Sequence, residues 1–219
     1  MMFAIALSLL AALPIVQRPA LSNAPTDHVA IMISGDGGWR PIDVGVTEPL
    51  RKQGIPVVGF LSNRYFGKRR TPEEAAHDLE LIIRDAMQRY GKHRLLLIGF
   101  SRGADVLPFL ANRLPDDLRK ITDVVALLGT EPTIDFKYHP SWIPFYHPHE
   151  PQFPVAPEIE KLRGMRILCV YGSREKHALC PTLDPTLVTV LRESGGHHFG
   201  GHYDEIAAAI LRTATISAP

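Results

Sequence analysis

Hydrophobic residues recur along the chain in two patterns, short continuous runs and runs with helical spacing. The continuous runs predict buried strands, because a strand covered on both faces is apolar at successive positions. The runs with helical spacing predict amphipathic helices, and the clearest of these extends from Thr71 to Tyr90. The predicted strands cover residues 28–34, 55–61, 95–98, 121–128, 165–171 and 187–191, and the predicted helices cover 44–52, 71–90, a segment beginning at 104, and 203–212.

This alternation of strands and helices predicts an α/β fold, with a mostly parallel sheet and helices on both of its faces. The 219 residues, of which 45% are hydrophobic and 21% charged, suffice for one domain with a sizeable core. The net charge of +1 gives no reason to expect a nucleic-acid partner. In a sheet of this kind, the loops at the carboxyl ends of the strands build the functional site.

The sequence Gly99-Phe100-Ser101-Arg102-Gly103 joins the predicted strand at 95–98 to the helix that begins at Ala104. A G-x-S-x-G string between a buried strand and a helix predicts a nucleophile elbow, a sharp turn that exposes the serine hydroxyl. The two glycines leave room where strand and helix nearly touch. The backbone N–H of Arg102, at the helix N-terminus, would then face a developing oxyanion. The alternative is a structural serine in an ordinary turn.

A second glycine-rich turn, Gly35-Asp36-Gly37-Gly38-Trp39, follows the first predicted strand. In α/β-hydrolases this is where the second N–H of the oxyanion hole is found, and Asp36 is the expected donor. Trp39 is a candidate for substrate contact. The alternative is a plain turn; a phosphate loop is excluded, because no Lys-Ser/Thr pair follows.

A serine hydroxyl needs a base, and the base needs an orienting acid, in the chain order Ser, Asp/Glu, His. Glu175 follows the predicted strand at 165–171 and is the expected acid. The turn before the last helix contains His197 and His198, and we favour His197 as the base, with His198 as the alternative. Together these residues predict an α/β-hydrolase fold and a serine carboxylic-ester hydrolase that needs no cofactor.

The stretch near residues 130–157 is rich in proline, histidine and aromatic residues. Its composition predicts a lid-like insertion that forms one wall of the substrate site. His139, His147 and His149 lie in it, but no carboxylate or cysteine spacing completes a metal site, so we expect no metal. The basic segment 63–70 is expected to be a solvated loop, with contact to an anion as the alternative.

Residues 1–24 begin with an apolar run and end in a small-x-small pattern, which predicts a signal peptide. An ordinary N-terminal strand or helix is the main alternative. The remaining residues, 25–219, are expected to form a single domain. Cys169 and Cys180 fit an exported protein with one disulfide, and the alternative is two buried thiols.

Five segments together resemble the VirJ/AcvB family of bacterial virulence proteins: ISGDGGW, NRYFGKRRTPEEAAHDL, GFSRGADVLPF, CVYGSREKHALCP and GGHHFGGHYDEIA. The resemblance implies an α/β-hydrolase exported to the periplasm that hydrolyses lysyl-phosphatidylglycerol and releases lysine. Ser101 matches the family's nucleophile, and the GGHHF histidine matches its base. His177 and His202 stand where the family pattern usually has acidic residues.

The implied partners are an aminoacylated phospholipid, a membrane surface contacted transiently, and components of a secretion system. Asp36, Asp105 and Glu131 are candidate carboxylates for the positive charge of a lysyl ester, and the aromatic insertion is a candidate contact for the lipid. Two other functions compete with this one. The first is a general serine esterase or thioesterase, and the second is a non-catalytic periplasmic binding partner of a secretion system.

Overall fold

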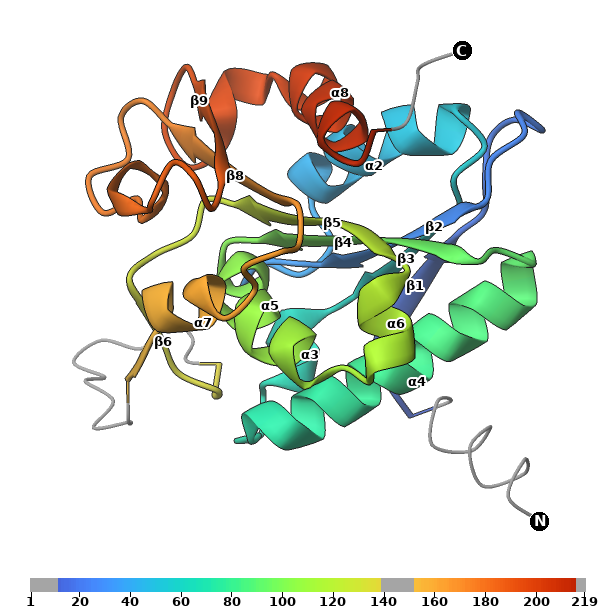
Figure 1. Ribbon diagram of the computed structural model, residues 1–219, viewed down its shortest axis with the longest axis horizontal. Coiled ribbons are helices and arrows are strands. Elements are labelled where there is room, and N and C mark those ends of the chain that lie inside the picture. Colours follow the sequence, from blue (N-terminus) through green and yellow to red (C-terminus); the bar gives the residue numbers. More distant parts are fainter. Residues whose placement is uncertain (1–11, 139–151, 216–219) are drawn as a thin grey trace.

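A seven-stranded sheet, in the order β1-β3-β2-β4-β5-β8-β9, runs through the centre of the computed structural model, which describes residues 12–138 and 152–215 (Figure 1). β1 is antiparallel to its neighbour β3, and the other strands of this sheet are parallel. The strands are β1 (Ile15–Arg18), β2 (His28–Ile33), β3 (Val57–Phe60), β4 (Arg94–Phe100), β5 (Thr122–Leu128), β8 (Ile167–Gly172) and β9 (Thr189–Glu193).

Helices cover both faces of this sheet: α2 and α8 lie on one face, and α4, α5 and α6 lie on the other (Figure 1). The predicted α/β fold with a mostly parallel, doubly covered sheet is therefore confirmed. The helices are α2 (Pro41–Lys52), α3 (Ser62–Tyr65), α4 (Pro72–Tyr90), α5 (Arg102–Arg113), α6 (Asp116–Lys120), α7 (Ala156–Glu160) and α8 (Tyr203–Thr213), with short 3₁₀ turns η1 (Cys180–Thr182) and η2 (Phe199–Gly201).

The central strands divide their side chains between two cores. In β2, Val29 and Ile31 belong to the core under α4 and α5, whereas Ala30 and Met32 belong to the core under α2 and α8. Both sets are fully buried, which explains why β2 and its neighbours are continuously apolar in sequence.

Helix α4 begins where the sequence predicts. Glu74 N–H donates to the Thr71 hydroxyl at 3.1 Å, and Thr71 N–H donates to the Glu74 carboxylate at 2.9 Å. This reciprocal capping box satisfies two backbone donors that the first turn leaves without helical partners. Gly91, in a left-handed conformation, ends the helix.

The segment before β2 is attached to the domain. β1 pairs with β3, Leu21 N–H donates to Arg51 O at 2.8 Å, and the Ser22 hydroxyl donates to Lys52 O at 2.7 Å. Part of the predicted signal peptide thus contributes the edge strand of the sheet. Cleavage after Ala24 stays a prediction, and it would remove that strand.

The ends of the predicted insertion form a two-stranded antiparallel ribbon, β6 (Thr133–Ile134) with β7 (Phe153–Pro154). Phe136 is buried and packs edge-to-face on Phe109 and Phe153, with ring centroids 5.4 Å and 5.5 Å apart. Phe136 is therefore a core residue, and Phe153 packs against the core. That the insertion forms a wall of the substrate site stays a prediction. Residues 139–151, including the three histidines discussed above, lie outside the described residues.

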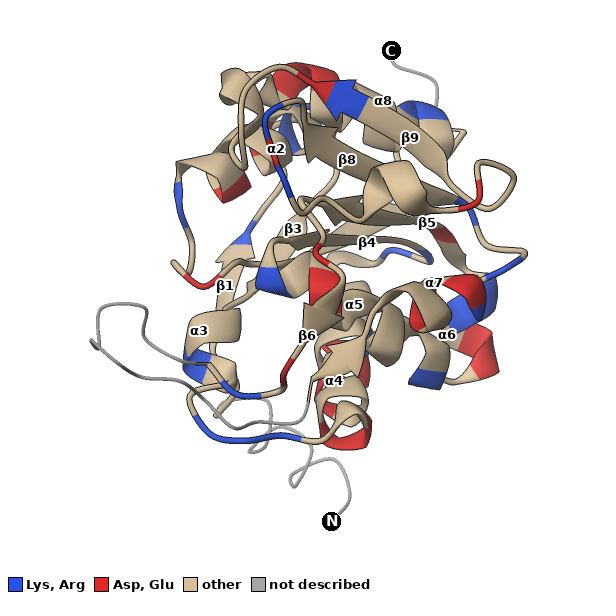
Figure 2. Ribbon diagram, turned by 90° about the vertical axis from the view of Figure 1, so that its left-hand side faces the viewer, with Lys and Arg blue, Asp and Glu red and all other residues tan. Residues whose placement is uncertain are grey.

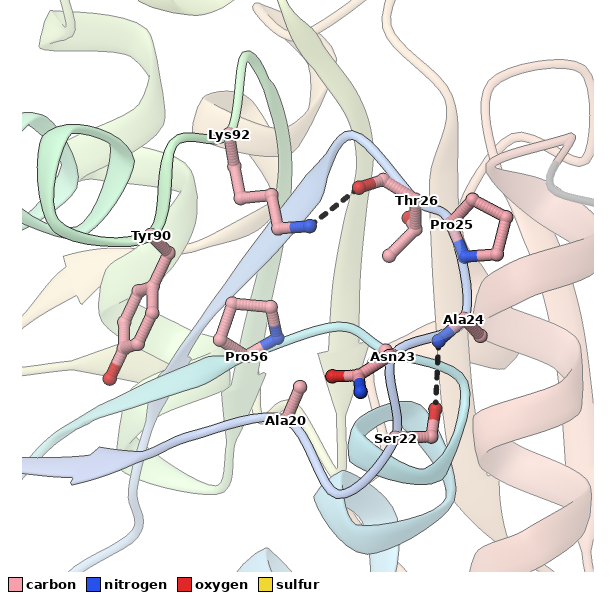
Figure 3. A pocket seen from close by; sticks show the side chains of 10 residues that line it. Ala20, Ser22, Asn23, Ala24, Pro25, Thr26, Pro56, Tyr90 and Lys92 are labelled. Atoms are coloured by element: carbon pink, nitrogen blue, oxygen red, sulfur yellow. Dashed lines mark hydrogen bonds between the residues drawn. The ribbon is translucent and has the colours of Figure 1, made fainter.

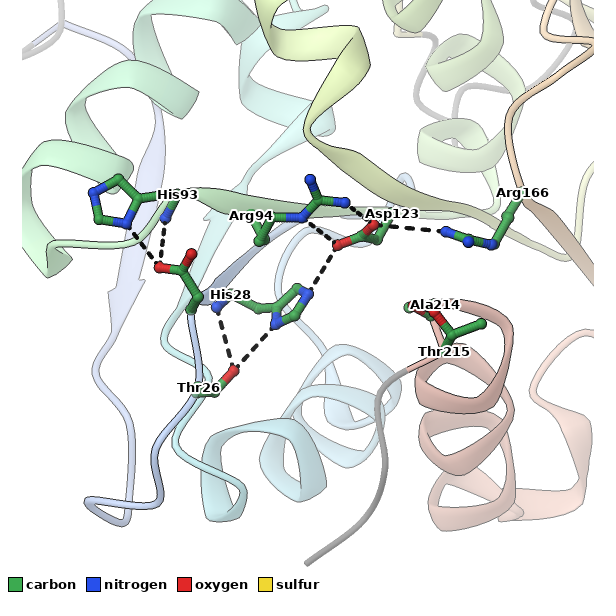
Figure 4. A network of polar contacts seen from close by, with 9 residues as sticks. Thr26, His28, His93, Arg94, Asp123, Arg166, Ala214 and Thr215 are labelled. Carbon is green, nitrogen blue, oxygen red and sulfur yellow. Dashed lines mark hydrogen bonds and ion pairs between the residues drawn. The ribbon is translucent and has the colours of Figure 1, made fainter.

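A polar network lies at the amino ends of the strands, opposite the edge where the loops after the strands gather. His28, Arg94 and Arg166 converge there on Asp123, which is buried (Figure 4). Burial alone would raise the pKa of Asp123, but the bonds from Arg94 and His28 lower it below its ordinary value.

A hollow of about 370 Å³ lies on the molecular surface between the 20–26 segment and Tyr90 (Figure 3). Lys92 donates there to Thr26 O at 2.6 Å.

Within residues 12–138 and 152–215, no helix has the length and apolarity needed to cross a membrane.

We predict that Asp123→Asn destabilises the protein by about 1–3 kcal/mol, because it leaves Arg94 and His28 without their carboxylate. The pKa of Asp123 is lowered in the folded state, so its stabilisation is present above pH 3.8, its ordinary value, and disappears as the pH falls further. Urea unfolding at neutral and acidic pH measures this, and an equal loss at both would contradict it.

We also predict that a variant lacking residues 1–24 unfolds at least about 5 °C below one lacking residues 1–11. The longer deletion removes β1 and exposes the edge of β3, which favours self-association. Thermal unfolding and size-exclusion chromatography of both variants measure this. Equal melting temperatures would show that β1 contributes nothing to the fold.

Candidate active site

Ser101 lies between the last residue of β4 and the first residue of α5, with φ 53° and ψ −124°. A positive φ is strained for a residue with a side chain, and such strain concentrates at functional turns. The backbone is held on both sides: Ser101 N–H donates to Leu128 O at 2.8 Å, and Ser101 O accepts from Asp105 N–H at 3.0 Å. Ser101 is half-buried, whereas Phe100 and Arg102 beside it are buried.

Two glycines make this turn possible. A Cβ at Gly99 would lie 2.3 Å from Gly103 O, and a Cβ at Gly103 would lie 2.1 Å from Ile33 O. Both distances are far shorter than a van der Waals contact, and the opposing atoms belong to the backbone, which cannot move aside as a side chain can. The ends of β2 and β4 and the start of α5 therefore approach so closely that only glycine fits at either position.

Glu175 and His197 form a hydrogen-bonded pair at the same edge of the sheet. Glu175 Oε1 lies 2.5 Å from His197 Nδ1, and Glu175 Oε2 accepts from Gly172 N–H at 2.5 Å. The carboxylate thus orients the imidazole through Nδ1 and leaves Nε2 to exchange a proton with a substrate or nucleophile.

The imidazole of His197 packs closely against the elbow region. A Cβ at Gly129, which follows β5, would lie 2.9 Å from His197 Cε1, and the ring of Phe100 is 5.1 Å from that of His197. His198 is exposed, and within the described residues its side chain makes no hydrogen bond. Of these two histidines, His197 has a carboxylate partner in the described residues and His198 has none, so the geometry favours His197.

The loop after β2 passes beside the nucleophile. A Cβ at Gly35 would lie 3.1 Å from Ser101 Cβ. The Asp36 carboxylate forms an ion pair with the buried Arg102 guanidinium. In the part of the chain that the structure describes, the backbone N–H groups of Asp36 and Arg102 donate to no protein acceptor. Both are therefore free to bind an oxyanion.

Comparison with known proteins identifies the family. The model of the bacterial virulence protein VirJ matches residues 27–217, most of the chain. The chain belongs to the VirJ family. No curated protein matches it.

Solved structures similar to this VirJ-family protein establish its fold. Est1E from Butyrivibrio proteoclasticus with ferulic acid bound has 14% identity and a TM-score of 0.64, over 91% of this chain and 93% of that one. MenH from S. aureus has 12% identity and a TM-score of 0.64, over 92% and 98%. XC6422 from Xanthomonas campestris, described as an α/β serine hydrolase without lid, has 16% identity and a TM-score of 0.58, over 94% and 90%. The predicted α/β-hydrolase fold is confirmed.

The disulfide predicted for this VirJ-family protein is confirmed. Cys169 in β8 is bonded to Cys180 in η1, with the Cα atoms 5.5 Å apart, and both residues are fully buried. The loop between them contains Glu175. Leu179 N–H donates to Thr130 O at 2.9 Å, which attaches the same loop to the end of β5. Glu175 therefore lies on a loop restrained at both ends.

The predicted substrate carboxylates differ in environment. Asp105 is 5% exposed, and its Oδ1 accepts from the Thr130 hydroxyl and Glu131 N–H, both at 2.8 Å. Burial raises the pKa of Asp105 to about 7. Asp105 thus connects α5 to the loop after β5, whereas the neighbouring Glu131 is exposed.

Trp39 packs its ring on the β3 backbone, because a Cβ at Gly59 would lie 2.2 Å from Trp39 Cζ3. Trp39 is partly buried and packs against the core under α2 and α8, and its contact with a substrate stays a prediction. Across residues 12–138 and 152–215, no group of three or more His, Cys, Asp or Glu side chains is arranged to hold a metal ion.

Sequence reasoning missed three features of the site: the contact of Gly129 with His197, the Arg102 side-chain bonds, and the bonds of Ser62 described below. For Gly129 the sequence did offer a signal, because Gly129 and Thr130 directly follow the predicted strand at 121–128, where the loops that build the site begin. The other two depend on contacts between distant segments and have no local signal.

The protonation of His197 depends on its partner. The hydrogen bond to Glu175 raises the pKa of His197 above its ordinary value of 6.5 and outweighs the lowering by burial. A base must be neutral to accept a proton, so activity that depends on His197 rises as the pH increases through this raised pKa.

We predict that Glu175→Gln lowers kcat/KM on the order of a hundredfold or more and shifts the midpoint of the pH rise to lower pH. The amide orients the imidazole poorly and no longer raises its pKa. Initial rates with a p-nitrophenyl ester between about pH 5 and pH 9 measure both effects. A lower rate with an unchanged midpoint would show that Glu175 does not set the protonation of the base.

Proposed function

We propose that this protein is a serine hydrolase that cleaves the aminoacyl ester of lysyl-phosphatidylglycerol in the periplasm. The observation that carries the proposal is a strained Ser101 at an elbow, with a hydrogen-bonded Glu175–His197 pair at the same edge of the sheet. A serine hydroxyl is a poor nucleophile without an oriented base, and the Glu175–His197 pair supports the assignment of such a base.

In the proposed mechanism, His197 Nε2 takes the proton of Ser101 as its Oγ attacks the ester carbonyl. The N–H groups of Asp36 and Arg102 stabilise the negative oxygen of the tetrahedral intermediate. Collapse of this intermediate breaks the ester bond, and the proton on His197 passes to the departing glycerol oxygen. Water, deprotonated by His197, then attacks the acyl-enzyme and releases lysine and free Ser101.

Membership of the VirJ family supports an aminoacyl lipid as the substrate. Of the three carboxylates considered for the lysyl ammonium groups, Asp36 is paired with Arg102, and Asp105 is buried in bonds to Thr130 and Glu131. Glu131 is exposed directly after the residues that contact His197. We therefore assign recognition of the cationic acyl group to Glu131.

Transient contact with the membrane follows from a lipid substrate. Exposed cations lie in the segments that follow the carboxyl ends of β3 and β8, at the edge that holds the site: Arg64 in α3, and Lys68, Arg174 and Lys176 on loops. Figure 2 looks onto this edge and shows Lys and Arg at several places around it. Cations at this edge attract anionic lipids at close range.

The buried disulfide supports an oxidising compartment such as the periplasm.

A general serine esterase or thioesterase is the second candidate, supported by the similar fold of an esterase domain from a Rhodothermus marinus protein at 13% identity and a TM-score of 0.57. The same machinery would act in either case, and only the substrate differs. A non-catalytic partner of a secretion system is the third candidate.

We predict that the wild-type protein releases free lysine from lysyl-phosphatidylglycerol in phosphatidylglycerol vesicles. Ser101→Ala and His197→Ala should lower the rate on the order of a thousandfold or more, since each removes a member of the triad. The matched control is His198→Ala, which removes the neighbouring histidine that lacks a carboxylate partner and should retain the rate within a few-fold.

The outcomes separate the candidates. Rapid turnover of short acyl esters with intact lysyl-phosphatidylglycerol would favour the general esterase. A wild-type protein that neither hydrolyses esters nor reacts with a fluorophosphonate probe would favour the binding partner. A larger loss of rate for His198→Ala than for His197→Ala would assign the role of the base to His198 instead of His197.

A further inference from the structure

We propose that Ser62 and the side chain of Arg102 hold the Gly35–Asp36 peptide in the orientation that presents its N–H to the oxyanion. This inference rests on the proposed hydrolase function. It assigns positioning roles to two side chains, one on each side of that peptide.

The carbonyl of this peptide is held from the side of β3. The Ser62 hydroxyl donates to Gly35 O at 2.9 Å, and the Ser34 hydroxyl donates to the same oxygen at 3.2 Å. Gly38 N–H, from within the loop, also donates to this oxygen at 3.0 Å, so Ser62 adds a restraint from outside the loop. Ser62 N–H in turn donates to the Ser34 hydroxyl at 3.2 Å. Both serines are fully buried, so water does not replace these bonds.

The planarity of the peptide transmits this restraint to the N–H. In a trans peptide the C=O and N–H point in opposite directions, so fixing Gly35 O toward Ser62 directs Asp36 N–H to the opposite side. Gly35 itself lies against Ser101, as the 3.1 Å approach described above shows. The peptide unit therefore borders the nucleophile with its donor directed away from the serine pair.

A second restraint acts through the Asp36 side chain. Its carboxylate pairs with the Arg102 guanidinium, which also donates from Nη1 to Asp135 O at 2.9 Å and to Asp135 Oδ1 at 3.3 Å. Arg102 is 9% exposed and Asp135 is buried, so this arrangement is stiff. Since Arg102 also supplies the other N–H donor, the ion pair connects the two donor residues of the oxyanion hole.

The loop needs such restraints because it is rich in glycine. A peptide next to glycine flips at little conformational cost. A flipped Gly35–Asp36 peptide would direct a carbonyl oxygen at the developing negative charge and remove one donor. Ser62 and Arg102 oppose this flip from two sides.

The test uses Ser62→Ala, which removes the hydroxyl and keeps a small side chain, and Arg102→Lys, which keeps the charge but loses the planar fork. The matched control is Thr122→Val. Thr122 Oγ1 makes the same kind of buried bond, to Leu118 O at 2.8 Å, at the opposite edge of the sheet. Kinetics with a p-nitrophenyl ester, inhibition by phenylboronic acid and thermal unfolding are measured for each protein.

We expect Ser62→Ala and Arg102→Lys to lower kcat roughly tenfold to a hundredfold with little change in KM. Affinity for phenylboronic acid should fall by a similar factor, because its tetrahedral adduct with Ser101 places an oxygen in the same hole. Thr122→Val should reduce thermal stability about as much as Ser62→Ala does, without changing kcat.

Two results would overturn the proposal. The first is a Ser62→Ala protein with kcat within twofold of wild type, and the second is a lower kcat with unchanged affinity for the boronic acid. Either result, together with an active wild type and an inactive Ser101→Ala, leaves the hydrolase function intact. An unreactive wild type overturns both proposals.

Discussion

The close approach of α5 to the ends of β2 and β4 is the constraint on which the site depends. The first turn of α5 lies in backbone contact with both strands, which excludes any side chain at Gly99 and Gly103. The chain has one residue in which to turn from strand to helix, and Ser101 adopts a left-handed conformation to do so. The same contact brings the loop after β2 against Ser101, so the proposed nucleophile and the proposed oxyanion donors are positioned by the same packing of α5 on the sheet.

The hydrogen-bonded Glu175–His197 pair is held by a second, separate set of backbone contacts. A Cβ at Gly172 would lie 2.2 Å from Gly196 O, and Arg174 N–H donates to Gly195 O at 2.8 Å. The loops after β8 and β9 therefore lie backbone against backbone, and they hold Glu175 and His197 at hydrogen-bond distance. Gly129 connects the two halves, because it follows β5 beside the elbow and contacts His197.

The features that sequence predicts are those with short-range signals. The central strands are continuous apolar runs, and the Ser101 turn is bounded by glycines, so both could be predicted from local pattern. An N-terminal strand was only the alternative to a signal peptide, because an apolar start is typical of a signal peptide and the pairing of β1 with β3 depends on residues far along the chain. Phe136 reads as a lid aromatic but packs in the core, since composition does not tell which way a side chain turns.

The disulfide has a consequence for a newly made chain. Its two cysteines are separated by 11 positions, and the bond closes only where thiols are oxidised. Without this bond, the segment bearing Glu175 lacks its covalent attachment to β8, whereas the elbow at Ser101 is held by hydrogen bonds and packing that do not involve the cysteines. Redox environment therefore acts most directly on the loop that carries Glu175, the side chain bonded to the imidazole of His197.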